Sequence, residues 1–186
     1  MAELISAAEV QFIKNHLQVS HLEISIRPSW GSKQASHREE IHGELKKKMA
    51  KAYPFSDSSI SHCLTLGGFV FTQFDSDHVI QIGFDLEEDS RVTTEVARRV
   101  CLTEDEFQRA PSAASLWSAK EAAFKSLKGP KQPLVVSEIE LTDWKKLDSQ
   151  YETVNVAGSA KFQSSQIQGI LLKKNPYTFA FFIARP

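Results

Sequence analysis

Two acidic residues, Asp85 and Glu87, stand one residue apart in a segment whose side chains alternate in character. Apolar residues fill the even-numbered positions from 80 to 86, so we predict a strand with both carboxylates on its other face, their backbones roughly 6 to 7 Å apart. Like charges at that spacing repel, and solvent, protonation or a bound cation would relieve the repulsion. Most such pairs are simply the solvent face of a strand end, but Mg²⁺ also takes carboxylate ligands together with substrate phosphates. Gly83 shares this face and would let a backbone or a ligand come close.

A second charged group lies in the segment LWSAKEAAFKSL at 116–127, which has the apolar spacing of an amphipathic helix. Glu121 and Lys125 are four residues apart and share one face of that helix, with Lys120 about 100° away. One interpretation is a surface ion pair that contributes roughly a few tenths of a kcal/mol. The other makes Glu121 an oxygen ligand or a base, and Lys125 a donor to a phosphate or a leaving group.

The composition excludes several classes of protein. The chain of 186 residues is 41% hydrophobic and carries 22 basic against 23 acidic residues, a formal net charge of −1. This balance predicts one compact globular protein without the basic footprint of a nucleic-acid binder. Cys63 and Cys101 have no paired spacing, which argues against a disulfide framework or a structural zinc site. No window approaches the ~20 apolar residues of a spanning helix and no secretion signal is present, so we expect a cytoplasmic protein without a membrane partner.

The first half of the chain should contain two helices and three strand-like runs. Ser36 and Glu39 form a capping-box pattern at the start of the second helix. The third strand-like run follows the second after the residues Asp-Ser-Asp, which predicts a hairpin between them. The predicted elements are helices over 3–17 and 37–52 and strands over 21–27, 60–74 and 78–87.

The second half combines helices with a strand-rich C-terminal third, and a second capping-box pattern joins Thr103 and Glu106. This mixture indicates an α+β fold with an antiparallel meander rather than a doubly wound parallel sheet. The predicted elements are helices over 93–101 and 113–128 and strands over 133–142, 151–162, 166–173 and 176–184.

The charged strand and the charged helix together resemble the two signature blocks of the 4′-phosphopantetheinyl transferases. IGFDLE at 82–87 is similar to the family's G-(I/V)-D-x-E strand, and LWSAKEAAFKSLKG at 116–129 is similar to its W-S-x-K-E-(A/S)-x-x-K helix. SISHC at 59–63 and ASHREEIHGEL at 35–45 resemble the family's N-(I/L)-S-H-S block and its H-R-x-x-x-G helix. The resemblance covers residues 35–129, about half of the chain.

The resemblance also implies a fold. Glu87 after Asp85, the S-H block, the W-S-x-K-E form and the chain length resemble the longer, monomeric type of the family, exemplified by the surfactin-synthetase activator. That type is built from two similar α/β halves, which implies an α+β fold whose antiparallel sheets pack as a pseudo-dimer. We expect a single domain over 1–186, with approximate halves 1–80 and 81–186.

The activity implied by the resemblance is transfer of 4′-phosphopantetheine from coenzyme A to a serine of an apo carrier protein, with release of 3′,5′-ADP, as in a holo-[acyl-carrier-protein] synthase. It implies that Asp85, Glu87 and Glu121 bind Mg²⁺ or Mn²⁺. Glu121 would also help to deprotonate the serine, and Lys125 would stabilise and protonate the departing phosphate. The carrier stays open among acyl, peptidyl and aryl carrier proteins of fatty-acid, polyketide, peptide-synthetase and aminoadipate-reductase systems.

The resemblance further matches five residues to coenzyme A. Ser61 and His62 correspond to positions that contact its phosphates, and Arg38 corresponds to the basic residue on its 3′-phosphate. Lys120 would lie along the diphosphate together with Lys125. For His62, the alternative is a histidine that merely packs in the interior.

The chain departs from the family pattern in three places. Phe84 stands where Ile or Val is common, on the inward face, and should be tolerated. Cys63 replaces the second serine of the S-H-S block and so loses a good hydroxyl donor. The chain between 53 and 59 is short, and the family's G-K-P loop, which helps to hold the nucleotide, is absent there. Two other hypotheses therefore stay open. The chain is a catalytically impaired homologue that still binds coenzyme A, or it is a structural protein whose charged residues are solvent-exposed and have no catalytic role.

Overall fold

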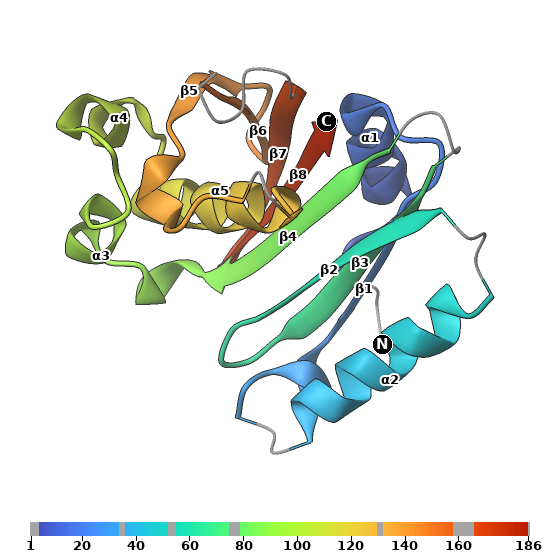
Figure 1. The fold of residues 1–186 in the computed structure, drawn as a ribbon. Helices are drawn as coiled ribbons and strands as arrows, with labels where there is room; N and C mark the ends of the chain where they lie inside the picture. Colours follow the sequence, from blue (N-terminus) through green and yellow to red (C-terminus); the bar gives the residue numbers. More distant parts are fainter. Residues whose placement is uncertain are drawn as a thin grey trace.

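Two antiparallel sheets, each covered by helices, form an α+β fold (Figure 1). The computed structural model describes residues 4–33, 36–51, 55–74, 79–129, 132–157 and 166–185. The smaller sheet has the strand order β1-β3-β2 and the larger one β4-β8-β7-β6-β5. The strands are β1 (Glu23–Arg27), β2 (Ser56–His62), β3 (Gly67–Gln73), β4 (Gln81–Glu88), β5 (Leu141–Lys146), β6 (Tyr151–Val156), β7 (Gln166–Lys174) and β8 (Tyr177–Arg185). The helices are α1 (Ala7–Leu17), α2 (His37–Met49), α3 (Thr94–Arg98), α4 (Glu104–Arg109) and α5 (Ala113–Ser126), with 3-10 turns η1 (Pro28–Trp30), η2 (Asp89–Arg91) and η4 (Val136–Glu138).

Three apolar clusters hold these layers together. The first joins side chains of α1, of the smaller sheet and of β4, β7 and β8, so the two sheets share one core. The second lies between α5 and the opposite face of the larger sheet, and the third lies between α2 and the smaller sheet. Burial of apolar area is the main favourable term in folding, so these contacts fix where α5 lies on the larger sheet.

Strand β4 is covered on both faces. Ile82 and Phe84 are fully buried in the core that the sheets share, as their alternation predicts. On the other face, a Cβ atom at Gly83 would lie 1.9 Å from the carbonyl oxygen of Ala122 in α5. Only glycine permits that approach, which confirms the prediction that a backbone comes close here. Asp85 lies on this same face, which α5 covers, and is only 5% exposed. The expectation that it lies on a solvent-facing surface is therefore wrong.

Side chains of β2 join the two sheets where this strand lies beside β4. Oδ2 of Asp57 accepts a hydrogen bond from the backbone N–H of Ile82 at 2.7 Å, and Oγ of Ser59 accepts one from the N–H of Phe84 at 3.0 Å. Both donors lie on the outer edge of β4, which has β8 as its strand partner. Polar side chains of β2 thus accept hydrogen bonds from N–H groups at the edge of β4, which would otherwise need another strand as a partner.

The predicted strands are partly confirmed. The antiparallel meander of β5, β6, β7 and β8 is present. The predicted hairpin is wrong, because the run 60–74 itself contains the turn between β2 and β3, and β4 pairs with β8. Its proposed turn, Asp-Ser-Asp at 75–77, lies outside the described residues. Most of the strand predicted over 133–142 is also wrong, since η4 precedes β5 there.

The helices follow the predicted positions with shorter bounds, and α2 ends at Met49. The capping box at Ser36 does not form, because its hydroxyl donates to Oε1 of Glu40 at 2.7 Å. Thr103 does cap α4 by accepting from the N–H of Glu106 at 3.1 Å, but the Glu106 carboxylate bonds elsewhere. Among the helices that the structure describes, none is long and apolar enough to cross a membrane.

Candidate active site

Asp85 lies where β2, β4 and α5 meet. Its Oδ1 accepts hydrogen bonds from Oγ of Ser61 and from Nζ of Lys125, each at 2.8 Å. The Lys125 ammonium also donates to Oγ of Ser61 at 3.3 Å, which closes a triangle of three side chains from three elements. The Asp85 side chain is 7% exposed and that of Lys125 is 28% exposed, so the ammonium reaches from the surface to a buried carboxylate.

The second oxygen of Asp85 has a different environment. Oδ2 is buried and has no hydrogen-bond partner among the residues that the structure describes. An unpaired buried polar atom costs about 1–3 kcal/mol, and more when it is charged. Such an atom marks a position where a cation or a donor would be stabilised.

Helix α5 brings Glu121 and Lys125 to this position. Its N-cap, Ser112, accepts a hydrogen bond from the N–H of Ser115 at 3.0 Å, and its alanine-rich face packs on the larger sheet. The close approach at Gly83 then places the helix directly against β4. Lys125 bonds to Asp85 and is mostly covered, which differs from the surface ion pair that was one interpretation of this segment.

Glu87 and Glu121 are ionisable groups in a partly buried environment. Burial raises the pKa of both carboxyl groups above the ordinary value, and the charge of Asp85 raises each pKa further. The hydrogen bond from the N–H of Glu88 opposes the shift at Glu87, and the Lys125 ammonium opposes it at Glu121. Because Asp85 acts on both, the three acidic residues share one electrostatic neighbourhood.

The donor set fits a hard divalent cation in its chemistry, since it consists of carboxylate oxygens of which one is buried and unpaired. The three carboxylates are nevertheless not drawn into a closed ligand cluster. Within the described ranges, no group of three or more Asp, Glu, His or Cys side chains is placed to hold a metal. Asp85, Glu87 and Glu121 are the residues that would hold a cation, and Oδ2 of Asp85 is the oxygen that most needs one.

Lys120 lies elsewhere. Its side chain is fully buried and its Nζ is 2.7 Å from Oε1 of Glu106, which is also fully buried. The ammonium donates in addition to the backbone carbonyl of Ile139. The predicted contact of Lys120 with a diphosphate therefore finds no support in this geometry, because that contact would require breaking a buried ion pair. The prediction placed both Lys120 and Lys125 at coenzyme A. Their different burial depends on packing of α4 and β5 that the sequence pattern does not reveal.

The other predicted coenzyme A contacts gather at one side of the site. The hydroxyl of Ser61 donates to Asp85, and the next residue, His62, packs edge-on against His37 with ring centroids 4.8 Å apart. Burial lowers the pKa of His62, and the nearby groups of His37, Arg38 and Lys125 lower it further. Arg38 is exposed at the start of α2. The structure therefore brings four of the predicted coenzyme A contacts into one basic neighbourhood: Arg38, Ser61, His62 and Lys125.

A shallow groove of about 470 Å³ borders the triangle of Asp85, Ser61 and Lys125. The sequence did not single out Lys128, which lines this groove, or its partner Asp57. Lys128 bonds through Nζ to both carboxylate oxygens of Asp57 at 2.6 Å, which ties the segment after α5 to β2. The sequence signal of this pair was weak, since Lys128 is only the last lysine of the helix block. The groove is lined by His42, Leu45, Ser58, Ser59, Ile60, Lys125, Lys128 and Gln132.

Comparison with known families addresses the same part of the chain. A family model described as the 4′-phosphopantetheinyl transferase superfamily matches residues 81–181, which is more than half of the chain. The matched range contains β4 and α5, and thus Asp85, Glu87, Glu121 and Lys125. A search of curated proteins gives no match to the chain. The match over more than half of its length shows that this chain belongs to the 4′-phosphopantetheinyl transferase superfamily.

Proposed function

We propose that this protein transfers the 4′-phosphopantetheine group of coenzyme A to a serine hydroxyl of an apo carrier protein and releases 3′,5′-ADP. Family membership supports phosphopantetheine transfer in general. The single observation that carries the proposal for this chain is the environment of Asp85, with one oxygen bonded to Ser61 and Lys125 and the other buried without a partner among the described residues.

Asp85, Glu87 and Glu121 would hold Mg²⁺, or alternatively Mn²⁺, which when bound neutralises charge on the diphosphate of coenzyme A. Glu121 is the residue proposed to accept the serine proton. Burial raises the pKa of its carboxyl group, and a base works best when its pKa is closer to the operating pH. The serine oxygen then bonds to the phosphorus that carries pantetheine, and the bond from this phosphorus to the bridging oxygen breaks.

Lys125 is proposed to act on the leaving group. Negative charge builds on the departing nucleotide phosphate as the bond breaks, and a positioned ammonium stabilises that charge and supplies a proton. Lys125 is suited to this role because it lines the groove while its Nζ is held by Asp85 and Ser61. Its 28% exposure leaves it accessible to a substrate phosphate.

Coenzyme A is proposed to lie along this groove. His42, Lys125 and Lys128 line it, and Arg38 and His62 lie in the same basic neighbourhood. These side chains offer charge-assisted hydrogen bonds to phosphates, and they are our candidates for holding the nucleotide in the absence of a G-K-P loop. Lys120 is left out of this set because of its buried pair.

The acceptor is proposed to be an acyl, peptidyl or aryl carrier protein, and the sequence leaves its pathway open. Cys63 and Cys101 are both unpaired thiols, which fits the reducing cytoplasm predicted from the sequence. The resemblance to the longer type of the family predicts a monomeric catalytic unit.

Mass spectrometry tests the proposal directly. Purified protein, Mg²⁺, coenzyme A and a panel of apo carriers should give a carrier that bears phosphopantetheine on its serine, together with free 3′,5′-ADP. If no carrier gains mass while coenzyme A still protects the protein against thermal unfolding, the chain is the impaired coenzyme A-binding homologue instead. Absence of both effects would refute the proposal.

A further inference from the structure

Within the part of the chain that the structure describes, strand β1 forms an unpaired edge of the smaller sheet. Among the described strands only β3 pairs with it, in an uninterrupted register from Glu23 opposite Phe71 to Arg27 opposite Gly67. It contains no proline and no bulge, two of the devices that prevent an edge from pairing with another chain. Its outward N–H and C=O groups are therefore a template for a further strand.

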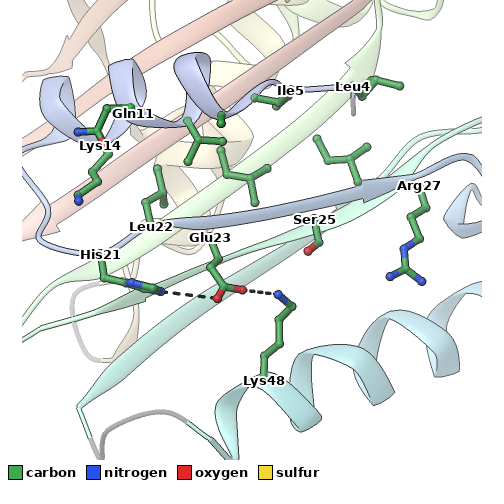
Figure 2. Close-up of a pocket in the computed structure, with 14 residues that line it drawn as sticks. Leu4, Ile5, Gln11, Lys14, His21, Leu22, Glu23, Ser25, Arg27 and Lys48 are labelled. Atoms are coloured by element: carbon green, nitrogen blue, oxygen red, sulfur yellow. Dashed lines mark hydrogen bonds and ion pairs between the residues drawn. The ribbon is translucent and has the colours of Figure 1, made fainter. Parts of the chain in front are cut away.

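A groove of about 580 Å³ runs along this edge, between α1 above β1 and Lys48 of α2 below it (Figure 2). The two isoleucines of β1 pack toward the core that α1 closes. Glu23, Ser25 and Arg27 point to the other side, toward α2, and Glu23 forms an ion pair with Lys48 (Figure 2). Arg27 lies against the ring of Trp30, with Cζ 4.5 Å from the ring centroid.

The sequence of this edge, Glu-Ile-Ser-Ile-Arg, is complementary to itself. When two copies run antiparallel and are centred on Ser25, Glu23 of each copy lies opposite Arg27 of the other, and Ile24 lies opposite Ile26. Directly opposed opposite charges and β-branched pairs both stabilise antiparallel strands. Every side chain then meets a matching partner.

Other pairings of two such edges are worse. A parallel, in-register arrangement would place Glu23 beside its own copy and Arg27 beside its own copy, so that like charges repel. A slip by one residue would turn the isoleucines to the face of the charged side chains. The charge pattern thus selects a single two-fold register.

We propose that a second copy of this chain docks on β1, in a two-fold arrangement that joins two three-stranded sheets into one six-stranded sheet. Such an interface is isologous, because the same patch serves both partners. Glu23, Ser25 and Arg27 lie on its axis and rim, and none of them lines the groove beside Lys125. This dimer departs from the monomer expected by resemblance to the longer type of the family. The catalytic unit nevertheless stays within one chain, so the assembly is independent of the proposed activity.

Charge reversal tests the register. In sedimentation experiments over a range of concentrations, the full chain should dimerise, while Glu23→Arg and Arg27→Glu should each be monomeric because like charges then face one another. An equimolar mixture of the two variants should recover the dimer, since both ion pairs are restored in the mixed assembly. Lys48→Met is the matched control: it removes the ion pair within the chain and should remain dimeric.

Cross-linking tests the axis. Opposed Cα atoms in antiparallel strands are about 4.5–5.5 Å apart, which suits a disulfide. In a Cys101→Ser background, Ser25→Cys should therefore form a covalent dimer on mild oxidation, whereas Ser29→Cys, exposed just beyond β1, should not. A full chain that stays monomeric, dimers that survive both charge reversals, or cross-linking of both cysteines alike would overturn the proposal.

Discussion

Lys125 donates to one oxygen of Asp85, at 2.8 Å, and leaves the other oxygen of the same carboxylate buried and unpaired within the described structure. This asymmetry has a chemical consequence. A cation at Oδ2 would not have to displace the ammonium from Oδ1, so both positive groups can act on a single substrate diphosphate. Asp85 would then position Lys125 as well as bind the metal.

Asp85→Asn should abolish transfer while the protein stays folded. The amide keeps the shape and can still accept from Ser61, but it removes the charge that a cation and Lys125 both need. Glu121→Gln should act similarly, because it removes the proposed ligand and the proposed base. We expect losses of about 10²-fold or more in kcat/KM, measured as phosphopantetheine on the carrier. Glu88→Gln, on the same strand, is the control, and wild-type activity in either site variant would refute the assigned roles.

The pKa shifts predict how the stability of the protein without metal depends on pH. The pKa of Glu87 and that of Glu121 are raised from 4.5, so the folded state binds protons more tightly than the unfolded state does. Their contribution to stability is thus complete below about pH 4.5 and is lost as the pH rises through the raised values. Urea unfolding in EDTA should show a smaller loss of stability toward neutral pH for Glu121→Gln than for wild type. An equal or steeper loss would contradict the cause assigned to the shift.

Mg²⁺ should reverse that loss. A cation binds the ionised carboxylates, so the rise in Tm with Mg²⁺ should be larger at pH 8 than at pH 5. At a concentration 100 times Kd, the free energy of unfolding should rise by about 2.7 kcal/mol. Differential scanning calorimetry of wild type and Asp85→Asn checks this, and Asp143→Asn, an exposed carboxylate of β5, is the control. Equal Mg²⁺ effects in all three proteins would show that the cation binds elsewhere.

The sequence predicted what depends on local periodicity. Alternation identified β4, and helical spacing identified α5 with Glu121 and Lys125 on it. Pairing between distant segments could not be read in this way, so the predicted hairpin failed where β4 instead pairs with β8. The burial of Lys120 was hidden for the same reason, since its partner lies 14 residues away on a different helix. In contrast, Gly83 was informative because a missing side chain implies a close neighbour wherever that neighbour comes from.

Replacement of Lys120 separates a structural role from substrate binding. Lys120→Met leaves Glu106 buried without its cation, although the N–H groups of Leu102 and Leu141 still donate to this carboxylate. Loss of one partner from a buried pair costs about 3–5 kcal/mol, measured by urea unfolding. The double variant Lys120→Met with Glu106→Gln should recover part of that loss, because no isolated charge remains. A stable Lys120→Met protein with an increased KM for coenzyme A would instead support the contact with the diphosphate.

Gly83→Ala should separate α5 from β4. The added Cβ would lie 1.9 Å from the carbonyl oxygen of Ala122 and 2.6 Å from the backbone nitrogen of Ser126, and backbone atoms cannot move aside individually. Overpacking costs about 1–3 kcal/mol, and a backbone clash this close should reach the upper end of that range.

The matched control is Gly43→Ala in α2, where a Cβ meets nothing within 4 Å. Alanine is the better helix former there, so this variant should gain about 0.5–1 kcal/mol and keep full activity. Transfer activity should fall in Gly83→Ala even at temperatures where that protein stays folded, because displacement of α5 carries Glu121 and Lys125 away from Asp85. If Gly83→Ala loses stability but keeps wild-type kcat/KM when folded, the alignment of helix and strand does not control the chemistry.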